Sequence, residues 1–252
     1  MSTTDYMALL RPRFRYGDIT PTAGLRRAPC YEFYRLVPLD VMQVVVGLGI
    51  EDYTTAGVEQ AMQRFWPCVD ALANEGVDSI RLGGAPISAQ LGRDRVRSLL
   101  AEIQQRTGVP GYASMEAIAA GLHHLGARTV TIGSRWADQL NAAVERYLTE
   151  AGLQVVHVTT RGQWSGEAFS MTFEQGLEMA LAVGREAILA APHADAVVVP
   201  GGSALSLHVI PALEDEFGKP VLTNLNAEVW QILVQPGVVE PVRGWGRLLA
   251  DR

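Results

Sequence analysis

The chain has 252 residues, of which 48% are hydrophobic and 19% are charged, and its formal net charge is −6. This composition supports a sizeable core in one large or two small domains and excludes a disordered chain. The negative charge argues against a nucleic-acid partner, and no apolar run reaches the roughly 18 residues of a membrane span. The first 14 residues lack the apolar core of a signal peptide, and two cysteines, Cys30 and Cys68, do not make a disulfide framework. We therefore expect a cytoplasmic protein with free thiols and no membrane partner, and we leave a homo-oligomer open.

The predicted elements alternate between strands and helices. Short apolar runs predict strands at residues 16–20, 44–46, 79–82, 129–132, 153–159, 196–199 and 220–223. Helical spacing of apolar residues predicts helices at residues 55–75, 94–107, 114–125, 137–151 and 171–190, from about 203 to 217, and again after 226. Pro67 should kink the first of these helices or shift its start. The alternation predicts an α/β fold of parallel sheets covered by helices. We expect one half from residues 1–112 plus 220–252 and a second half from 113–219.

A Gly-Gly-x-x-x-Ser pattern follows two of the predicted strands, at Gly83 and at Gly201. Glycine permits a sharp turn and the close approach of another molecule. Ser203 can cap the helix predicted after the second pair, and free N–H groups at a helix start favour an anion. The repeat suggests two similar halves with a site between them, although glycine is also common at strand ends in any parallel α/β protein.

Motifs for nucleotides and metals are incomplete. The chain has no phosphate-binding P-loop, and Gly47-Leu48-Gly49 lacks the third glycine of a dinucleotide fingerprint. His123 and His124 are adjacent on a predicted helix and cannot share one face, which argues against a metal site there. We therefore expect no metal and no cofactor.

Several stretches, taken in order, resemble the aspartate/glutamate racemase superfamily and, within it, the branch of arylmalonate decarboxylase and maleate cis-trans isomerase. The resemblance is carried by residues 19–24, 83–88, 121–136, 196–206 and 220–230. It implies two Rossmann-like α/β halves related by pseudo-two-fold symmetry, with the site in the cleft between them. It also implies cofactor-free and metal-free chemistry on a small carboxylate substrate.

The chain departs from this family where the family places its cysteines. The racemases and isomerases use two facing cysteines, and the decarboxylases keep the second. Here the first position falls on Gly84, or on Gly83 in a shifted register, and the second falls on Gly201 or Gly202, with Pro200 as a weaker match. Because glycine has no proton to give, we predict decarboxylase or isomerase/racemase chemistry through an enediolate or carbanion with a non-cysteine proton donor. The alternatives are a lyase or hydratase with a carboxylate base and a catalytically inactive carboxylate-binding protein.

Glu116 is the predicted proton-transfer residue, because it begins a helix whose start borders the cleft in the family. A first-turn glutamate favoured by the helix dipole is the simpler explanation of this residue. Cys30, predicted in a loop after the first strand, is a second candidate, and Arg81 is expected either to bind a substrate carboxylate or to form a structural ion pair. Trp136 falls where the decarboxylases have a substrate-contacting tyrosine. The predicted substrate-binding residues are Thr22, Gly84, Ala85, Trp136, Gly201, Gly202, Ser203 and Asn224.

Overall fold

A computed structural model describes residues 11–22, 27–164, 167, 170–201 and 206–252, with only the backbone described for residues 27–30. None of the described helices is long and apolar enough to cross a membrane.

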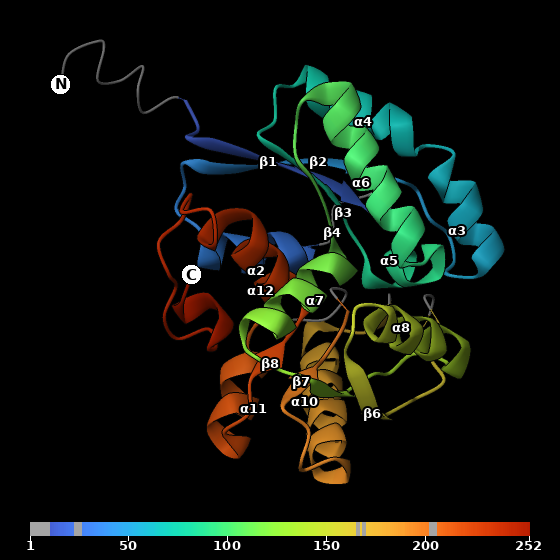
Figure 1. Cartoon of the computed structure of the whole chain (residues 1–252), viewed down its shortest axis with the longest axis vertical. Helices are drawn as coiled ribbons and strands as arrows, with labels where there is room; N and C mark the ends of the chain where they lie inside the picture. The colour runs from blue at the N-terminus through green and yellow to red at the C-terminus, as the bar shows by residue number, and fades with distance from the viewer. Residues whose placement is uncertain (1–10, 23–26, 165–166, 168–169, 202–205) are drawn as a thin grey trace.

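Eight strands in the described part of the chain form two parallel sheets of four strands (Figure 1). The first sheet has the order β2-β1-β3-β4 and the second has the order β6-β5-β7-β8. The strands are β1 (Phe14–Thr20), β2 (Val41–Gly47), β3 (Ser79–Leu82), β4 (Gly111–Ala113), β5 (Thr129–Ile132), β6 (Gln154–Val158), β7 (Ala196–Val198) and β8 (Val221–Leu222). The two orders are equivalent, so that β3 and β7, which the two glycine patterns follow, hold the same place in their sheets. The α/β fold with two similar halves, expected from the sequence, is confirmed.

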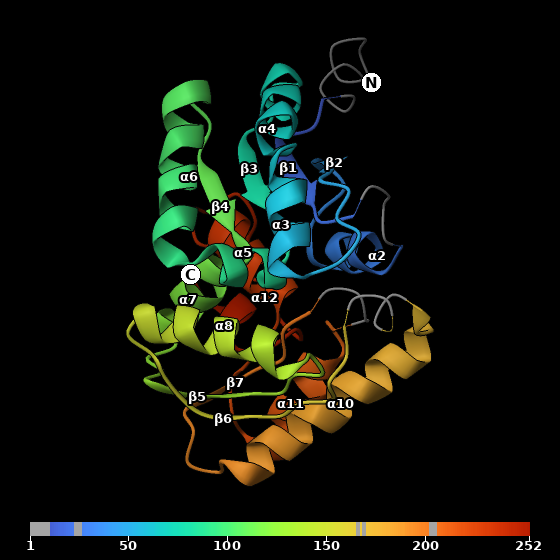
Figure 2. The same ribbon diagram turned by 90° about the vertical axis from the view of Figure 1, so that its right-hand side faces the viewer.

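Helices surround both sheets and fill the space between them. Figure 2 shows α3, α4 and α6 in the half of the first sheet and α8, α10 and α11 in the half of the second. The helices are α2 (Arg27–Leu36), α3 (Thr55–Met62), α4 (Phe65–Asn74), α5 (Ala85–Leu91), α6 (Arg93–Thr107), α7 (Ser114–His124), α8 (Asp138–Glu150), α10 (Phe173–Ala190), α11 (Val209–Phe217) and α12 (Asn224–Val229), with a π-helical turn at Trp230–Val234 and a 3₁₀ turn at Leu248–Ala250.

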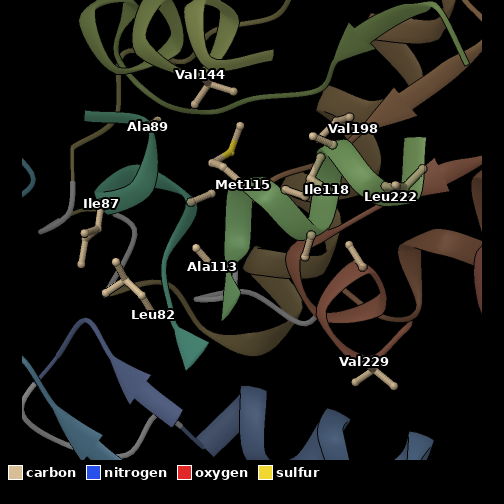
Figure 3. Close-up of a cluster of buried hydrophobic side chains, with 14 of the residues drawn as sticks. Leu82, Ile87, Ala89, Ala113, Met115, Ile118, Val144, Val198, Leu222 and Val229 are labelled. Carbon is tan, nitrogen blue, oxygen red and sulfur yellow. The ribbon is translucent and has the colours of Figure 1, made fainter. Parts of the chain in front are cut away.

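A continuous apolar core joins the two halves around α7 (Figure 3). Met115 and Ile118 of this helix are fully buried, as are Val198 of β7 and Leu222 of β8. Val144 of α8 belongs to the same cluster. Burial of apolar surface is the main source of folding free energy, so this cluster holds the halves in a fixed relation.

A buried ion pair ties α12 to the first sheet. Arg81 of β3 contacts the carboxylates of Asp18 on β1 and Glu228 on α12. Gln43 donates to Asp18 at 2.8 Å, and the Ser114 hydroxyl donates to Glu228 at 2.5 Å. Of the two roles considered for Arg81, the structure shows the ion pair, and its guanidinium is occupied by protein carboxylates.

The last strand does not lie where the domain division expected it. Strand β8 was assigned to the first half, but it pairs with β7 at the edge of the second sheet, Val197 opposite Val221. Helix α12, which follows it, returns to Arg81 of the first sheet. The assignment of residues 1–112 to one domain and of residues 113–219 to another remains a prediction.

Three further elements differ from expectation. The helix predicted at 55–75 is broken into α3 and α4, with Pro67 in the first turn of α4, where its missing N–H has no partner to lose. The loop predicted around Cys30 contains helix α2. Helix α11 begins at Val209 with His208 as its N-cap, not near Ser203, because residues 207 and 208 form a turn before it.

Candidate active site

The carboxyl ends of β1 and β3 meet in the first half. Gly84, which follows β3, has a φ of +95°, and a Cβ built on it would lie 2.7 Å from Cγ of Pro21 in the turn after β1. Thr22 is the next residue of that turn, and its carbonyl accepts a hydrogen bond from the Thr20 hydroxyl at 3.2 Å. Ala85 is fully buried and begins α5, with Gly84 as N-cap. Of the predicted substrate-binding residues, Gly84 and Ala85 therefore lie at a turn that contacts the turn of Thr22.

The corresponding turn of the second half joins three more predicted residues. The Gly201 N–H donates to Oδ1 of Asn224 at 3.2 Å. A Cβ built on Gly201 would lie 3.6 Å from Cζ2 of the buried Trp136. Asn224 thus uses its side-chain oxygen to hold the turn, and Trp136 lies against it. Gly202 and Ser203 lie outside the described residues.

The backbone favours glycine at the described positions that the sequence analysis matches to the cysteines of the family. Gly84 and Gly201 have φ values of +95° and +121°, a conformation that residues with a Cβ rarely adopt. At Gly83 a Cβ would lie 2.9 Å from the carbonyl oxygen of Ile19. A cysteine would therefore be strained by its backbone torsion at Gly84 and Gly201, and at Gly83 it would press against the main chain of Ile19.

Arg135 is a site residue that the sequence analysis did not single out. Its side chain is only 6% exposed, and its Nε has no hydrogen-bond partner among the described residues. Burial lowers the pKa of its guanidinium, and Tyr53, from the loop after β2 in the first half, acts in the opposite direction. Arg135 lines a pocket together with Gly133, Met179, Ala180, Val183, Val199, Pro200, Gly201 and Ser206. The sequence feature that could have identified Arg135 is its position next to Trp136, in a turn that follows a buried strand.

Glu32 is a second such residue, on α2 of the first half. It is 1% exposed, and its Oε1 accepts a hydrogen bond from the Leu207 N–H of the second half at 2.7 Å. Burial raises the pKa of this carboxyl from 4.5 to about 7, although hydrogen bonds from the backbone of Leu207 and Ser206 act to lower it. Since Ser206 also lines the Arg135 pocket, Glu32 supports the wall of that pocket. Sequence spacing gave no signal for this contact across the two halves.

Glu116 has two polar partners from neighbouring helices. Its carboxylate accepts from Nε of Arg93 at 2.7 Å and from the Tyr147 hydroxyl at 3.0 Å. It lines a recess with Arg97, Leu100, Gly111, Tyr112 and Gln231, none of which lines the pocket of Arg135. The proton-transfer role of Glu116 remains a prediction. In the structure its carboxylate forms an ion pair with Arg93 of α6 and accepts a hydrogen bond from Tyr147 of α8, so it links α7 to both helices.

The cysteines and potential metal ligands add little to this site. Cys68 is buried, burial raises the pKa of its thiol, and its sulfur lies 3.7 Å from the carbonyl oxygen of Gly47. The side chain of Cys30 lies outside the described residues. Within the described ranges, no three His, Cys, Asp or Glu side chains gather as a metal site.

Two equivalent parallel sheets, each with a glycine turn after its corresponding strand, define an α/β protein built of two similar halves. The family model for arylmalonate decarboxylase matches residues 20–249, and the chain belongs to this family. It is 27% identical to arylmalonate decarboxylase of Bordetella bronchiseptica over 234 residues, which cover 92% of this chain and 95% of the relative.

Solved structures agree with this assignment. A liganded double mutant of arylmalonate decarboxylase, with one glycine changed to cysteine and one cysteine to serine, matches with a TM-score of 0.84 and 26% identity, covering 93% of this chain and 98% of that one. A maleate isomerase mutant from Pseudomonas putida S16 with maleate matches in fold, with a TM-score of 0.81, 18% identity and coverage of 94% and 97%. The predicted relationship to the aspartate/glutamate racemase superfamily, in the arylmalonate decarboxylase and maleate isomerase branch, is confirmed.

Proposed function

We propose that this protein is a cofactor-independent enzyme that acts on a small carboxylic acid through an enediolate or carbanion, by decarboxylation or by isomerisation or racemisation. The family membership supports this class of reaction. The observation that carries the particular proposal is the pair of glycine turns, Gly84 and Gly201, at equivalent places in the two halves. Both positions carry glycine, in a backbone conformation that residues with a Cβ rarely adopt, so we assign the proton transfer to another group.

The turns would serve as anion-holding elements. Loss of CO₂ or of an α-proton leaves negative charge next to the remaining carboxylate, and fixed donors aimed at that charge are usually the largest catalytic contribution. We assign this task to backbone N–H groups at Gly84, Ala85, Gly202 and Ser203. Trp136 would form a wall of the pocket, and Thr22 and Asn224 would complete the binding residues.

A carboxyl group is the proposed proton donor. Glu116 is the candidate from the sequence, and Glu32 is a second candidate, since its pKa of about 7 suits proton transfer near neutral pH. Removal of a general acid or base typically lowers the rate by about 10²- to 10⁴-fold. One of the two variants Glu116→Gln and Glu32→Gln should therefore lose turnover by that factor while substrate binding persists. Full turnover in both variants would refute a carboxyl donor.

The first experiment is a substrate screen. Arylmalonates, maleate and related mono- and dicarboxylates are incubated with the purified protein, and CO₂ release, proton exchange with D₂O and double-bond geometry are followed by NMR. Enediolate chemistry predicts that at least one acid exchanges its α-proton, loses CO₂ or isomerises. Loss of that activity on dialysis against a chelator, with recovery on adding a divalent ion, would refute the metal-free mechanism.

Two other functions have distinct outcomes in the same screen. A lyase or hydratase with a carboxylate base would add or remove water across a double bond, so the NMR spectra would show a hydroxy acid converted to or from an unsaturated acid. A binding protein would bind an acid tightly and turn over none.

A further inference from the structure

Arg135 is a buried cation without an ion-pair partner among the described residues. Every Asp and Glu of the chain except Asp5 lies in the described ranges, and the ion pairs found there do not include Arg135. Arg81 shows the contrast, because two carboxylates neutralise it. A buried charge without an opposite charge raises the free energy of the folded protein. The stability of the fold therefore does not explain why a buried, uncompensated arginine stands at this position.

The guanidinium of Arg135 faces the turn at Gly201. Its Nη1 and Nη2 lie 3.4 and 3.6 Å from the place where a Cβ of Gly201 would be. Among the described residues, Gly201 therefore places no side chain against this side of the guanidinium. Trp136 borders the same place, and the charge of Tyr53, from the first half, acts to raise the pKa of Arg135. The cation thus lies beside the Gly201 turn, in the pocket that Arg135 and Gly201 both line.

The chemistry of the group indicates its ligand. A guanidinium presents a planar fork of N–H donors that matches the two oxygens of a carboxylate. An anion at the Gly201 turn would supply the negative charge that neutralises Arg135. The side of this anion away from Arg135 would lie next to the aromatic ring of Trp136.

We propose that Arg135 binds a carboxylate group of the ligand at the Gly201 turn, and that this contact makes the pocket select an anionic acid over the corresponding neutral amide. The inference rests on the proposed function for the class of ligand, a small carboxylic acid. It concerns equilibrium binding, so it can be tested without turnover.

The test compares Arg135→Met and Arg135→Lys with the wild type, using malonate, maleate and malonamide as probes in calorimetry. Arg185→Met, which removes an exposed arginine paired with Glu216, is the matched control for net charge. We expect the wild type to bind malonate or maleate and not malonamide. Arg135→Met should weaken acid binding by about 10- to 100-fold, since it removes a charge-assisted hydrogen bond. Arg135→Lys should give an intermediate loss, and the control should bind as the wild type does.

A second measurement separates binding from folding. Because the buried charge has no carboxylate partner, the ligand-free Arg135→Met variant should unfold at the same temperature as the wild type or at a higher one. A marked fall in its unfolding temperature would assign Arg135 a structural role and overturn the inference. The inference would also be overturned if Arg135→Met bound malonate and maleate as tightly as the wild type does, or if the wild type bound neither acid.

The outcomes distinguish this inference from the proposed function. If an acid is turned over and Arg135→Met binds it as the wild type does, the inference fails and the enzyme assignment stands. If Arg135-dependent binding is found and no acid reacts, the inference stands and the proposed function fails.

Discussion

The buried carboxyl group of Glu32 allows a prediction of how the stability of the protein depends on pH. Its carboxyl is buried between the halves and accepts a hydrogen bond from Leu207. Burial raises its pKa from 4.5 to about 7, and a change of this size corresponds to roughly 3 kcal/mol between the two protonation states.

The sign follows from proton binding. Between pH 4.5 and about 7 the folded protein keeps the Glu32 proton that the unfolded chain has released, so the folded state binds more protons. The contribution of this group to stability is therefore fully present below pH 4.5 and is lost as the pH rises to about 7. Glu32→Gln keeps an oxygen that can accept from Leu207 and cannot ionise. We expect the stability of the variant relative to the wild type to rise by roughly 3 kcal/mol from pH 4.5 to pH 8.

The assay is urea unfolding of both proteins at several pH values between 4.5 and 8. The difference between the two free energies of unfolding removes the titration of all other groups. Glu178→Gln, a change at an exposed glutamate of α10, controls for net charge. A difference between wild type and Glu32→Gln that stays constant across this range would refute the argument that burial raises the pKa of Glu32.

Three further predictions concern other parts of the molecule. Glu228→Gln leaves Arg81 with one carboxylate and should lower the free energy of unfolding by about 3 kcal/mol in urea unfolding; a loss below about 1 kcal/mol would mean that Asp18 alone satisfies the cation. Gly201→Ala forces a Cβ into a backbone with φ of +121° and should cost about 1–3 kcal/mol in the same assay, whereas an unchanged stability would show that the turn relaxes freely. Activity should resist iodoacetamide, because Cys68 is buried; inactivation that keeps pace with labelling of Cys30 would identify a thiol as the proton donor.

The sequence by itself determined the elements and their class. Alternation of short apolar runs with helical periodicity is a local property, and it gave the strand at Thr129–Ile132 with the bounds that the structure has. Local chemistry also predicted a disturbance at Pro67 and tight turns at Gly84 and Gly201. Local patterns failed where the tertiary context decided the outcome, as in the three-residue strand β4, which is too short to carry a periodic signal.

Only the tertiary structure decided which polar groups meet. Arg81 could be recognised as a residue in need of a partner, but its partners lie 63 and 147 positions away in the sequence. Glu32 and Leu207 are separated by 175 positions, and no local pattern relates them. In the sequence Arg135 resembles any arginine in a turn, and only folding buries it beside Gly201 without a carboxylate partner among the described residues. Burial and charge pairing are properties of the packed chain, and for that reason the residues that now define the candidate site emerged from the fold.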